Sequence, residues 1–267
     1  MAVLLHSQHP RGPSKSSLDV TLDYLSLVSD ESSRIVSAYE RNPKAPIPWS
    51  ERWTVGTVAR HVAATHHVVA GIIGGRPDAD FGLFGDLWTP PKEAPEFVDW
   101  FRLGTASLLE QLASVPGDDE CWSWFEPGRR VGWWARRMAL EAVVHRSDTD
   151  GAQGKELLIA SDVAADGIDE YLDVFVATSR AAHASPAGPT MSFECSDRSD
   201  RWWLDLSVRG ARAVSRESRE SSVRIRGTAE QLLLLVWGRV PFPDSSGVEV
   251  SGEVGVLDRW SELVPAI

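Results

Sequence analysis

The sequence has few cysteines, no long apolar run and no excess of positive charge. Its two cysteines, Cys121 and Cys195, lie in different halves of a 267-residue chain and show no metal-type spacing. A disulfide framework is therefore not expected, and a reducing cytoplasm fits this cysteine usage. No segment approaches the roughly 20 apolar residues of a membrane span. The apolar run that begins at residue 1 is too short for a signal peptide. We expect a cytoplasmic protein that does not span a membrane.

The charge balance excludes further classes of partner. The formal net charge is −11, whereas proteins that bind nucleic acid usually carry a basic surface. An anionic membrane surface would likewise repel such a chain. We expect no nucleic acid and no membrane among its partners, while an acidic small molecule remains possible where a few arginines converge.

The length and the composition fit a globular protein of two domains. Hydrophobic residues make up 43% and charged residues 24% of the chain, which is ordinary for a folded protein. Twelve tryptophans are unusual, and most lie in the first half. They would fill a helical core or line a pocket, and core filling is the commoner use.

The first half shows helical periodicity after an N-terminal arm, residues 1–16, that we expect to be disordered. Apolar stripes predict helices over residues 17–41, 54–73, 95–115 and 131–148. Thr54 is a suitable N-cap for the second helix, and residues 76–95, rich in Gly, Pro and Asp, form a long connection. Four such helices predict an antiparallel bundle, in which metal sites are built from inward-facing side chains.

The second half mixes strands and helices. Its patterns predict a helix at 161–182, strands at 190–196, 202–209, 222–226 and 248–252, and helices at 229–237 and 253–263. The predicted fold is therefore a mixed two-domain one, with a four-helix bundle over residues 17–155 and an α+β domain over residues 156–267.

Three residues on two predicted helices are candidate metal ligands. Glu141 and His145, four residues apart, lie on one helix face together with Trp134 and Met138, and that face should point into a core. His61 lies on the inner edge of the second helix. A carboxylate and an imidazole are costly inside a core unless they are paired or bind a metal. Two histidines and one carboxylate form the ligand set of an open catalytic site.

Simpler interpretations exist for each of these residues. Most Glu and His pairs at this spacing are solvated neighbours on a helix surface. A single histidine on an apolar stripe, such as His61 or His66, is more often a core residue with a hydrogen-bond partner. His67 is expected to point outward. The case for a metal rests on the convergence of three polar groups where a bundle should be dry.

Two motifs carry a resemblance to a known family. Residues 48–61 follow the pattern P-x(4)-W-T-V-x(5)-H, ending at His61, and residues 136–148 follow R-x(4)-E-x(3)-H-R-x-D. Both resemble signatures of DinB-like metal-dependent thiol enzymes, and the chain is most similar to the mycothiol-dependent maleylpyruvate isomerase family of actinobacteria. Residues 232–239 and 248–252 resemble the C-terminal domain of that family, which is similar to sterol-carrier proteins.

The resemblance implies a set of functional residues and cofactors. It implies zinc, or a similar divalent metal, held by His61, Glu141 and His145, and mycothiol as the thiol cosubstrate. It also implies a functional arginine from the C-terminal domain, for which Arg239 is the candidate. Arg146, Asp148 and Arg239 could orient the thiol or pair with a carboxylate. Asp148, one turn beyond His145, could hold the imidazole tautomer. Nickel and manganese can use the same ligands.

The expected chemistry is activation of sulfur. A thiol that binds at the open position of the metal should lose its proton. The thiolate could then add to a cis double bond and leave after rotation, as in an isomerase, or displace a leaving group, as in an S-transferase. The small-molecule acceptor stays open, as does the choice between monomer and homodimer.

Two alternatives belong to other classes. The chain could be a non-catalytic binding module that carries a hydrophobic metabolite in its C-terminal domain. It could instead be a DinB-like metal hydrolase, or a transferase that uses a different thiol.

Overall fold

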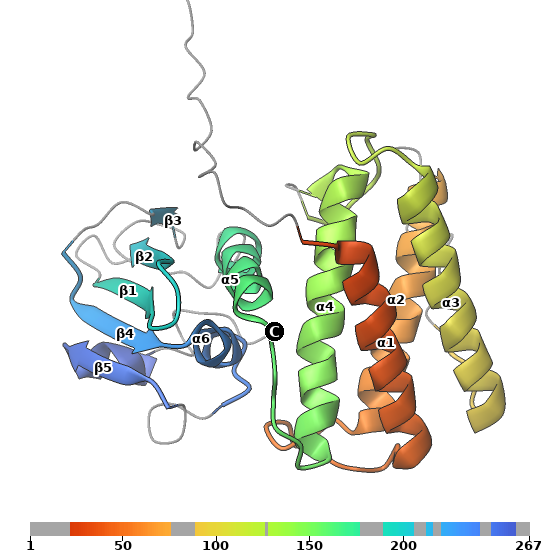
Figure 1. Cartoon of the computed structure of the whole chain (residues 1–267), viewed down its shortest axis with the longest axis horizontal. Coiled ribbons are helices and arrows are strands. Elements are labelled where there is room, and N and C mark those ends of the chain that lie inside the picture. The colour runs from red at the N-terminus through yellow and green to blue at the C-terminus, as the bar shows by residue number, and fades with distance from the viewer. Residues whose placement is uncertain are drawn as a thin grey trace, which may run out of the picture.

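Four helices form the N-terminal part of the protein. The structure is a computed structural model that describes residues 22–75, 89–125, 128–176, 189–205, 212–215, 220–240 and 247–259. The four helices are α1 (Tyr24–Arg41), α2 (Val55–Gly75), α3 (Ala94–Ser114) and α4 (Val131–Ala152). They lie side by side in Figure 1 and confirm the predicted bundle. The arm predicted at residues 1–16 lies outside the described residues.

The start of α2 is fixed by two threonines. The backbone N–H of Thr57 donates to Oγ1 of Thr54 at 3.3 Å, and the N–H of Thr54 donates to Oγ1 of Thr57 at 2.7 Å. This reciprocal pair works like a capping box, because each side chain satisfies a backbone donor that the helix leaves unpaired. The predicted cap at Thr54 is confirmed, and it sets the position of His61 two turns into the helix.

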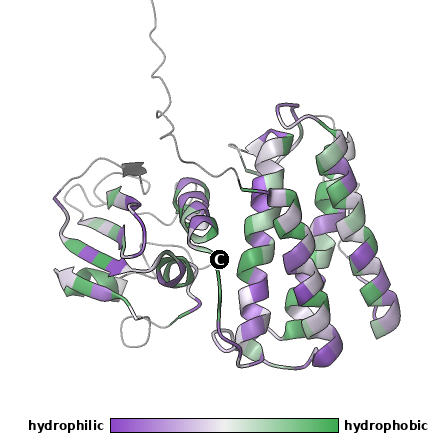
Figure 2. Ribbon diagram, viewed as in Figure 1, coloured by the Kyte–Doolittle hydropathy of each residue, from purple (hydrophilic) through white to green (hydrophobic). Residues whose placement is uncertain are grey.

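Helix α4 is buried along almost its whole length. One side packs in the bundle against α1 and α2, and the other side faces the C-terminal part (Figure 1). Hydrophilic and hydrophobic residues are interspersed along it (Figure 2). The helix continues four residues beyond the predicted end at Asp148. Asp148 and Asp150 would oppose the helix dipole there, but Arg239 and Lys155 bind them and offset the charge.

The C-terminal part combines two helices with a five-stranded sheet. Helix α5 (Ser161–Glu170) continues into a π-helical turn, η4 (Tyr171–Val176), and α6 (Ala229–Val236) begins with a capping box at Thr228. The strands are β1 (Thr190–Cys195), β2 (Arg201–Asp205), β3 (Arg212–Ser215), β4 (Val223–Gly227) and β5 (Glu249–Gly252). Helices α5 and α6 lie between this sheet and the bundle (Figure 1). The mixed two-domain fold class is confirmed.

The sheet has the order β3-β2-β1-β4-β5. Strands β1 and β4 are parallel, whereas the other neighbours are antiparallel. Strand β3 was not among the strands predicted from the sequence. The predicted helix at 253–263 is wrong over its described residues, where the chain forms a 3₁₀ turn, η5 (Val254–Arg259). The ends of the helix predicted at 161–182 and of the strand predicted at 202–209 lie outside the described residues.

The two parts share one apolar core. Leu140, Val143 and Val144 of α4 belong to the same buried cluster as the side chains of α5, α6 and the sheet. Two further clusters lie inside the bundle. Among the described helices, none combines the length and apolar character that crossing a lipid bilayer requires. Helix α4 therefore links the bundle to the C-terminal part, and it also carries two of the three candidate ligands.

Candidate functional site

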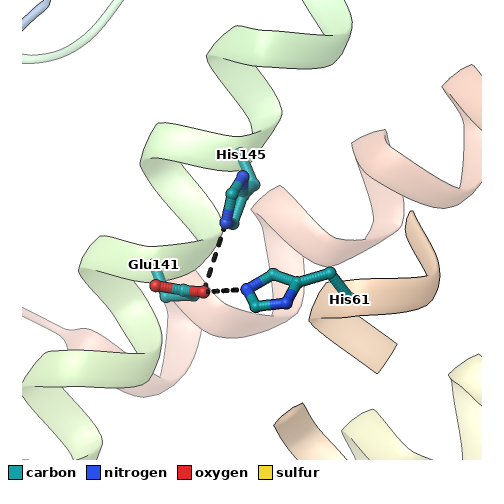
Figure 3. A group of neighbouring side chains, drawn as sticks. All are labelled: His61, Glu141 and His145. Atoms are coloured by element: carbon teal, nitrogen blue, oxygen red, sulfur yellow. Dashed lines mark hydrogen bonds and ion pairs between the residues drawn. The ribbon is translucent and has the colours of Figure 1, made fainter. Parts of the chain in front are cut away.

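His61, Glu141 and His145 converge in the structure. His61 comes from α2, and Glu141 and His145 come from successive turns of α4 (Figure 3). Nε2 of His61 lies 2.8 Å, and Nε2 of His145 3.2 Å, from the same oxygen of Glu141, Oε1. One ligand atom from each residue lies within 4.8 Å of the other two. The arrangement that the spacing predicted is therefore present, and metal binding by these residues stays a prediction.

The donor atoms fit a small divalent cation. Ligands about 2.0–2.1 Å from a tetrahedral zinc ion lie about 3.3 Å from one another, close to the two distances that join Glu141 to the histidines. Burial lowers the pKa of His145 and so favours the neutral ring. The donors and their spacing thus match the set that zinc prefers.

Asp148 determines which nitrogen of His145 faces Glu141. Its Oδ2 lies 2.8 Å from Nδ1 of His145, and a carboxylate there accepts the Nδ1 proton. The lone pair of Nε2 then points at the Glu141 oxygen, so two acceptors oppose each other. A cation between them would turn this repulsion into attraction.

Asp148 is itself held from two other parts of the chain. The indole N–H of Trp49 donates to Oδ1 at 2.8 Å, and the guanidinium of Arg239 donates through Nε at 2.9 Å and Nη2 at 3.2 Å. Burial by itself raises the pKa of Asp148, but the bonds from His145 and Arg239 outweigh it and lower the pKa to about 2. Asp148 therefore stays a carboxylate at neutral pH.

Arg239 reaches Asp148 because of the turn that ends α6. Gly238 has a φ of +67°, a backbone conformation that favours glycine, and the N–H of Arg239 bonds to the carbonyl of Leu234 at 2.8 Å. This turn ends the helix and places Arg239 against α4. Arg239, a residue of the C-terminal part, thus contacts the carboxylate that binds His145, and its functional role stays a prediction.

The second oxygen of Glu141 binds Arg137. Nη2 of Arg137 contacts Oε2 of Glu141, and Nη1 contacts Oε2 of Glu170 in α5 at 2.6 Å. Burial raises the pKa of the Glu170 carboxyl, and the ion pair with Arg137 works against that rise. Arg137 is not among the functional residues predicted from the sequence. The position of Arg137 four residues before Glu141 is a signal that could have indicated this contact.

Arg146 does not contact the three candidate ligands in the described part of the chain. Its guanidinium binds Glu31 of α1 at 2.6 Å, Asp150 at 3.1 Å and the carbonyl of Leu158 at 2.8 Å. Among the described residues, these contacts lead away from the three candidate ligands. They give no support to the prediction that Arg146 binds the thiol.

Trp53 lies beside the two histidines. Its ring is nearly parallel to that of His145, with the centroids 6.0 Å apart, and meets His61 edge-on at 5.4 Å. The side chain of His61 is 38% exposed, whereas those of Glu141 and His145 are below 10%. The three candidate ligands are therefore open to solvent on the side of His61. Burial of the rest of the His61 ring and the nearby His145 lower the pKa of His61 to about 3.

The other two histidines of α2 lie outside this group. Nδ1 of His66 is 3.0 Å from the hydroxyl of Thr105, in the core between α2 and α3. His67 was predicted to point outward, but it is half-buried and stacks on Trp100, with the ring centroids 4.0 Å apart.

Two family models match almost all of the described chain. The model described as the mycothiol maleylpyruvate isomerase N-terminal domain matches residues 25–150, and that of the MDMPI C-terminal domain matches residues 162–259. The chain belongs to the mycothiol-dependent maleylpyruvate isomerase family. The family resemblance seen in the motifs is thereby confirmed, and the matched N-terminal segment includes all three candidate ligands.

Two solved structures have a fold similar to that of this chain. A crystal structure of the mycothiol-dependent maleylpyruvate isomerase has a TM-score of 0.58 and 14% identity, over 86% of this chain and 92% of that one. A histidine-to-alanine variant of that isomerase gives the same values. At this identity the likeness shows the shared fold alone. A comparison with functionally curated proteins finds no match.

Proposed function

We propose that this member of the family is a metal-dependent enzyme that uses mycothiol. In this proposal His61, Glu141 and His145 hold a divalent ion, for which zinc fits the donor set. The observation that carries the proposal is the single carboxylate oxygen that faces two imidazole nitrogens, one of them fixed as an acceptor by Asp148. When bound, such an ion lowers the pKa of a coordinated thiol and so favours the nucleophilic thiolate.

The proposed reaction is cis–trans isomerisation of a maleylpyruvate-like acid. The name of the family and of the similar solved isomerase supports this choice. The thiol sulfur forms a bond to one carbon of the double bond, the remaining single bond rotates, and the same sulfur leaves as the double bond forms again. The thiol is recovered, so no oxidant or reductant is consumed. In S-transfer, the alternative, the sulfur would remain in the product.

The surrounding residues have distinct roles in this proposal. Asp148 keeps a proton on Nδ1 of His145, and Arg239 keeps Asp148 in place through two bonds. A guanidinium has more N–H donors than these contacts use, so Arg239 can also bind the carboxylate of a substrate. Arg146 receives a structural role, because Glu31, Asp150 and Leu158 hold it.

The carrier alternative receives less support from the packing. Phe193, Trp202 and Leu232 are fully buried between the sheet and the helices of the C-terminal part. These side chains themselves occupy the apolar interior that a carried metabolite would need. We therefore assign the C-terminal part a role in completing the site.

Elemental analysis of the purified protein tests the metal. We expect about one equivalent of a divalent metal in the wild type and a complete loss of it in His145→Ala, since a three-ligand site cannot spare one. His67→Ala is the control, because His67 lies on α2 and contacts Trp100 instead of the site. Unchanged metal content in His145→Ala would contradict the proposal.

A thiol-dependent activity screen then tests the reaction. We expect turnover of a cis-unsaturated acid with mycothiol and none when the thiol is omitted. Recovery of all the thiol after turnover identifies isomerisation, whereas a thioether product identifies S-transfer. A metal-free protein that co-purifies with an apolar ligand would instead favour the carrier.

A further inference from the structure

The two oxygens of Glu141 have different partners. Oε1 faces His61 and His145, whereas Oε2 binds the guanidinium of Arg137. The other branch of that guanidinium binds Glu170, which belongs to α5 in the C-terminal part. The side chains of Glu141, Arg137 and Glu170 are all below 10% exposed. A continuous buried chain of charges therefore runs from a candidate ligand to the other half of the protein.

We propose that Arg137 and Glu170 are positioning residues for the metal ligand Glu141. They fix Oε2 of Glu141 in the ion pair and leave Oε1 as the single ligand atom, so metal affinity depends on one residue of α5, Glu170. The inference rests on the proposed function, because it assigns a role toward the same metal.

Glu170 balances the charge of Arg137. Arg137 alone would neutralise Glu141 and compete with a cation for it, since ion pairs of buried groups are weakly screened. Glu170 lies 2.6 Å from the same guanidinium and offsets its charge. With both carboxyl groups ionised, the three groups together carry a net charge of one negative unit, which favours a divalent cation beside Oε1.

Aromatic side chains of the C-terminal part pack against Arg137. Its guanidinium lies over the ring of Phe175 in η4 at 5.0 Å and over that of Trp237 at the end of α6 at 5.7 Å. Cation–π contacts of this kind hold a planar guanidinium in one orientation. The C-terminal part thus supplies both the counter-ion of Arg137 and the aromatic surfaces that orient it.

The neighbouring ion pair offers a matched control. Arg136 binds Asp166 at 2.9 Å, and Asp166 lies one turn before Glu170 on the same helix. This pair joins the same two helices, but its contacts among the described residues lead to Tyr24 instead of Glu141. Loss of either acidic residue weakens the docking of α5, and only loss of Glu170 disturbs the ligand.

The test compares metal affinity in Glu170→Gln and Asp166→Asn. Full-length proteins are stripped of metal and titrated with Zn²⁺ against a chromophoric chelator, and the stability of the metal-free forms is measured by denaturation. We expect Glu170→Gln to weaken Zn²⁺ binding at least about tenfold, the size typical of residues that orient a ligand. Asp166→Asn should change the dissociation constant less than about twofold, the scatter of such a difference measurement.

Two further readouts keep the inference testable. Arg137→Lys retains the charge but cannot bridge two carboxylates in one plane, so it should also weaken Zn²⁺ binding. This variant replaces Glu170→Gln as the test if Glu170→Gln fails to fold. In Co²⁺-loaded protein, both variants should change the visible d–d absorption, because a released Glu141 can bind through both oxygens. Equal effects of Glu170→Gln and Asp166→Asn on affinity, or an unchanged affinity in both Glu170→Gln and Arg137→Lys, would overturn the inference. A wild type that binds no Zn²⁺ would overturn the proposed function itself.

Discussion

At the scale of single residues, the histidines of α2 differ in what their ring nitrogens contact. Nε2 of His61 faces Glu141, whereas His66 lies in the dry core between α2 and α3. The Thr105 hydroxyl donates to the carbonyl of Phe101, so it accepts the Nδ1 proton of His66. Nε2 of His66 has no hydrogen-bond partner among the described residues. His66 is therefore a neutral core residue, and burial, with smaller contributions from His67 and His61, lowers its pKa to about 3.

The acid sensitivity of the metal-free protein should depend on His66. Its pKa is about 3 in the folded protein and 6.5 for an ordinary histidine, so the unfolded chain binds one more proton between these values. The free energy of unfolding should therefore fall as the pH drops from 6.5 toward 3. In His66→Leu, this fall should be shallower by about 1.4 kcal/mol per pH unit. Denaturant unfolding at several pH values with a chelator present measures it, and identical slopes in both proteins would contradict the assignment.

At the scale of helices, one glycine allows close packing at the end of α4. A Cβ added at Gly151 would overlap the ring of Trp49. The same ring carries the N–H that donates to Asp148. The absence of a side chain in the last turn of α4 therefore lets Trp49 reach the carboxylate that orients His145.

Gly151→Ala should consequently affect the site from a distance. Displacement of Trp49 removes a donor from Asp148, and we expect weaker Zn²⁺ binding together with a loss of about 1–3 kcal/mol of stability from overpacking. Gly74→Ala is the control, because a Cβ at Gly74 would make only ordinary contact, at 3.6 Å from Gln111. That variant should keep its affinity and gain up to about 1 kcal/mol. Full Zn²⁺ affinity in Gly151→Ala would show that Asp148 does not need Trp49.

The contact between α1 and α4 depends on Arg146. Glu31→Ala leaves that guanidinium buried with fewer counter-charges, and we expect it to cost about 3 kcal/mol, the low end for a broken buried pair, because Asp150 still binds. Arg34→Ala removes only the exposed partner of Glu31, at 3.9 Å, and should cost less than about 1 kcal/mol. Denaturant unfolding compares the two. Neither variant should change Zn²⁺ affinity. A loss of Zn²⁺ affinity in Glu31→Ala would indicate that Arg146 does contribute to the site.

The helices of the bundle and the Glu141–His145 pair could be predicted because they follow from local periodicity, and His61 because it lies on the inner edge of its helix. Thr54, Glu141 and His145 act through neighbours within one turn of a helix, and spacing alone places them. The contacts of Arg137 with Glu170 and of Arg239 with Asp148 join residues 33 and 91 positions apart. They depend on how the two parts dock, which no periodicity records. The 3₁₀ turn in place of the final helix likewise depends on packing instead of on pattern.

At the scale of the whole molecule, three ion pairs among the described residues connect the bundle to the C-terminal part. Arg136 and Arg137 of α4 bind Asp166 and Glu170 of α5, respectively. In the third pair the C-terminal part supplies the cation, Arg239, and α4 supplies the anion, Asp148. The shared apolar cluster on α4 lies beside them. We expect the two parts to unfold together in one cooperative transition, because separation would expose this cluster and leave the charges unpaired.

Loss of the two carboxylates of α5 that bind α4, Asp166 and Glu170, should separate the two parts. In the double variant Asp166→Ala and Glu170→Ala, two arginines of α4 lose their partners in α5, and Arg137 keeps only Glu141. We expect unfolding to split into two steps, seen as non-coincident transitions by tryptophan fluorescence and circular dichroism. Arg198→Ala is the control, because its main partner, Asp200, lies within the C-terminal part. A single coincident transition in the double variant would mean that the apolar cluster and the Arg239–Asp148 pair suffice to couple the parts.

Trp53 gives the protein an optical reporter of its own. Its indole lies parallel to the imidazole of His145 and edge-on to that of His61. Open-shell ions such as Cu²⁺ quench indole fluorescence over short distances. An ion held by these histidines would therefore reduce the fluorescence of Trp53 more than that of most other tryptophans. Loading of the site could thus be followed in a fluorimeter without an added dye, and the difference between the wild type and Trp53→Phe would isolate that signal.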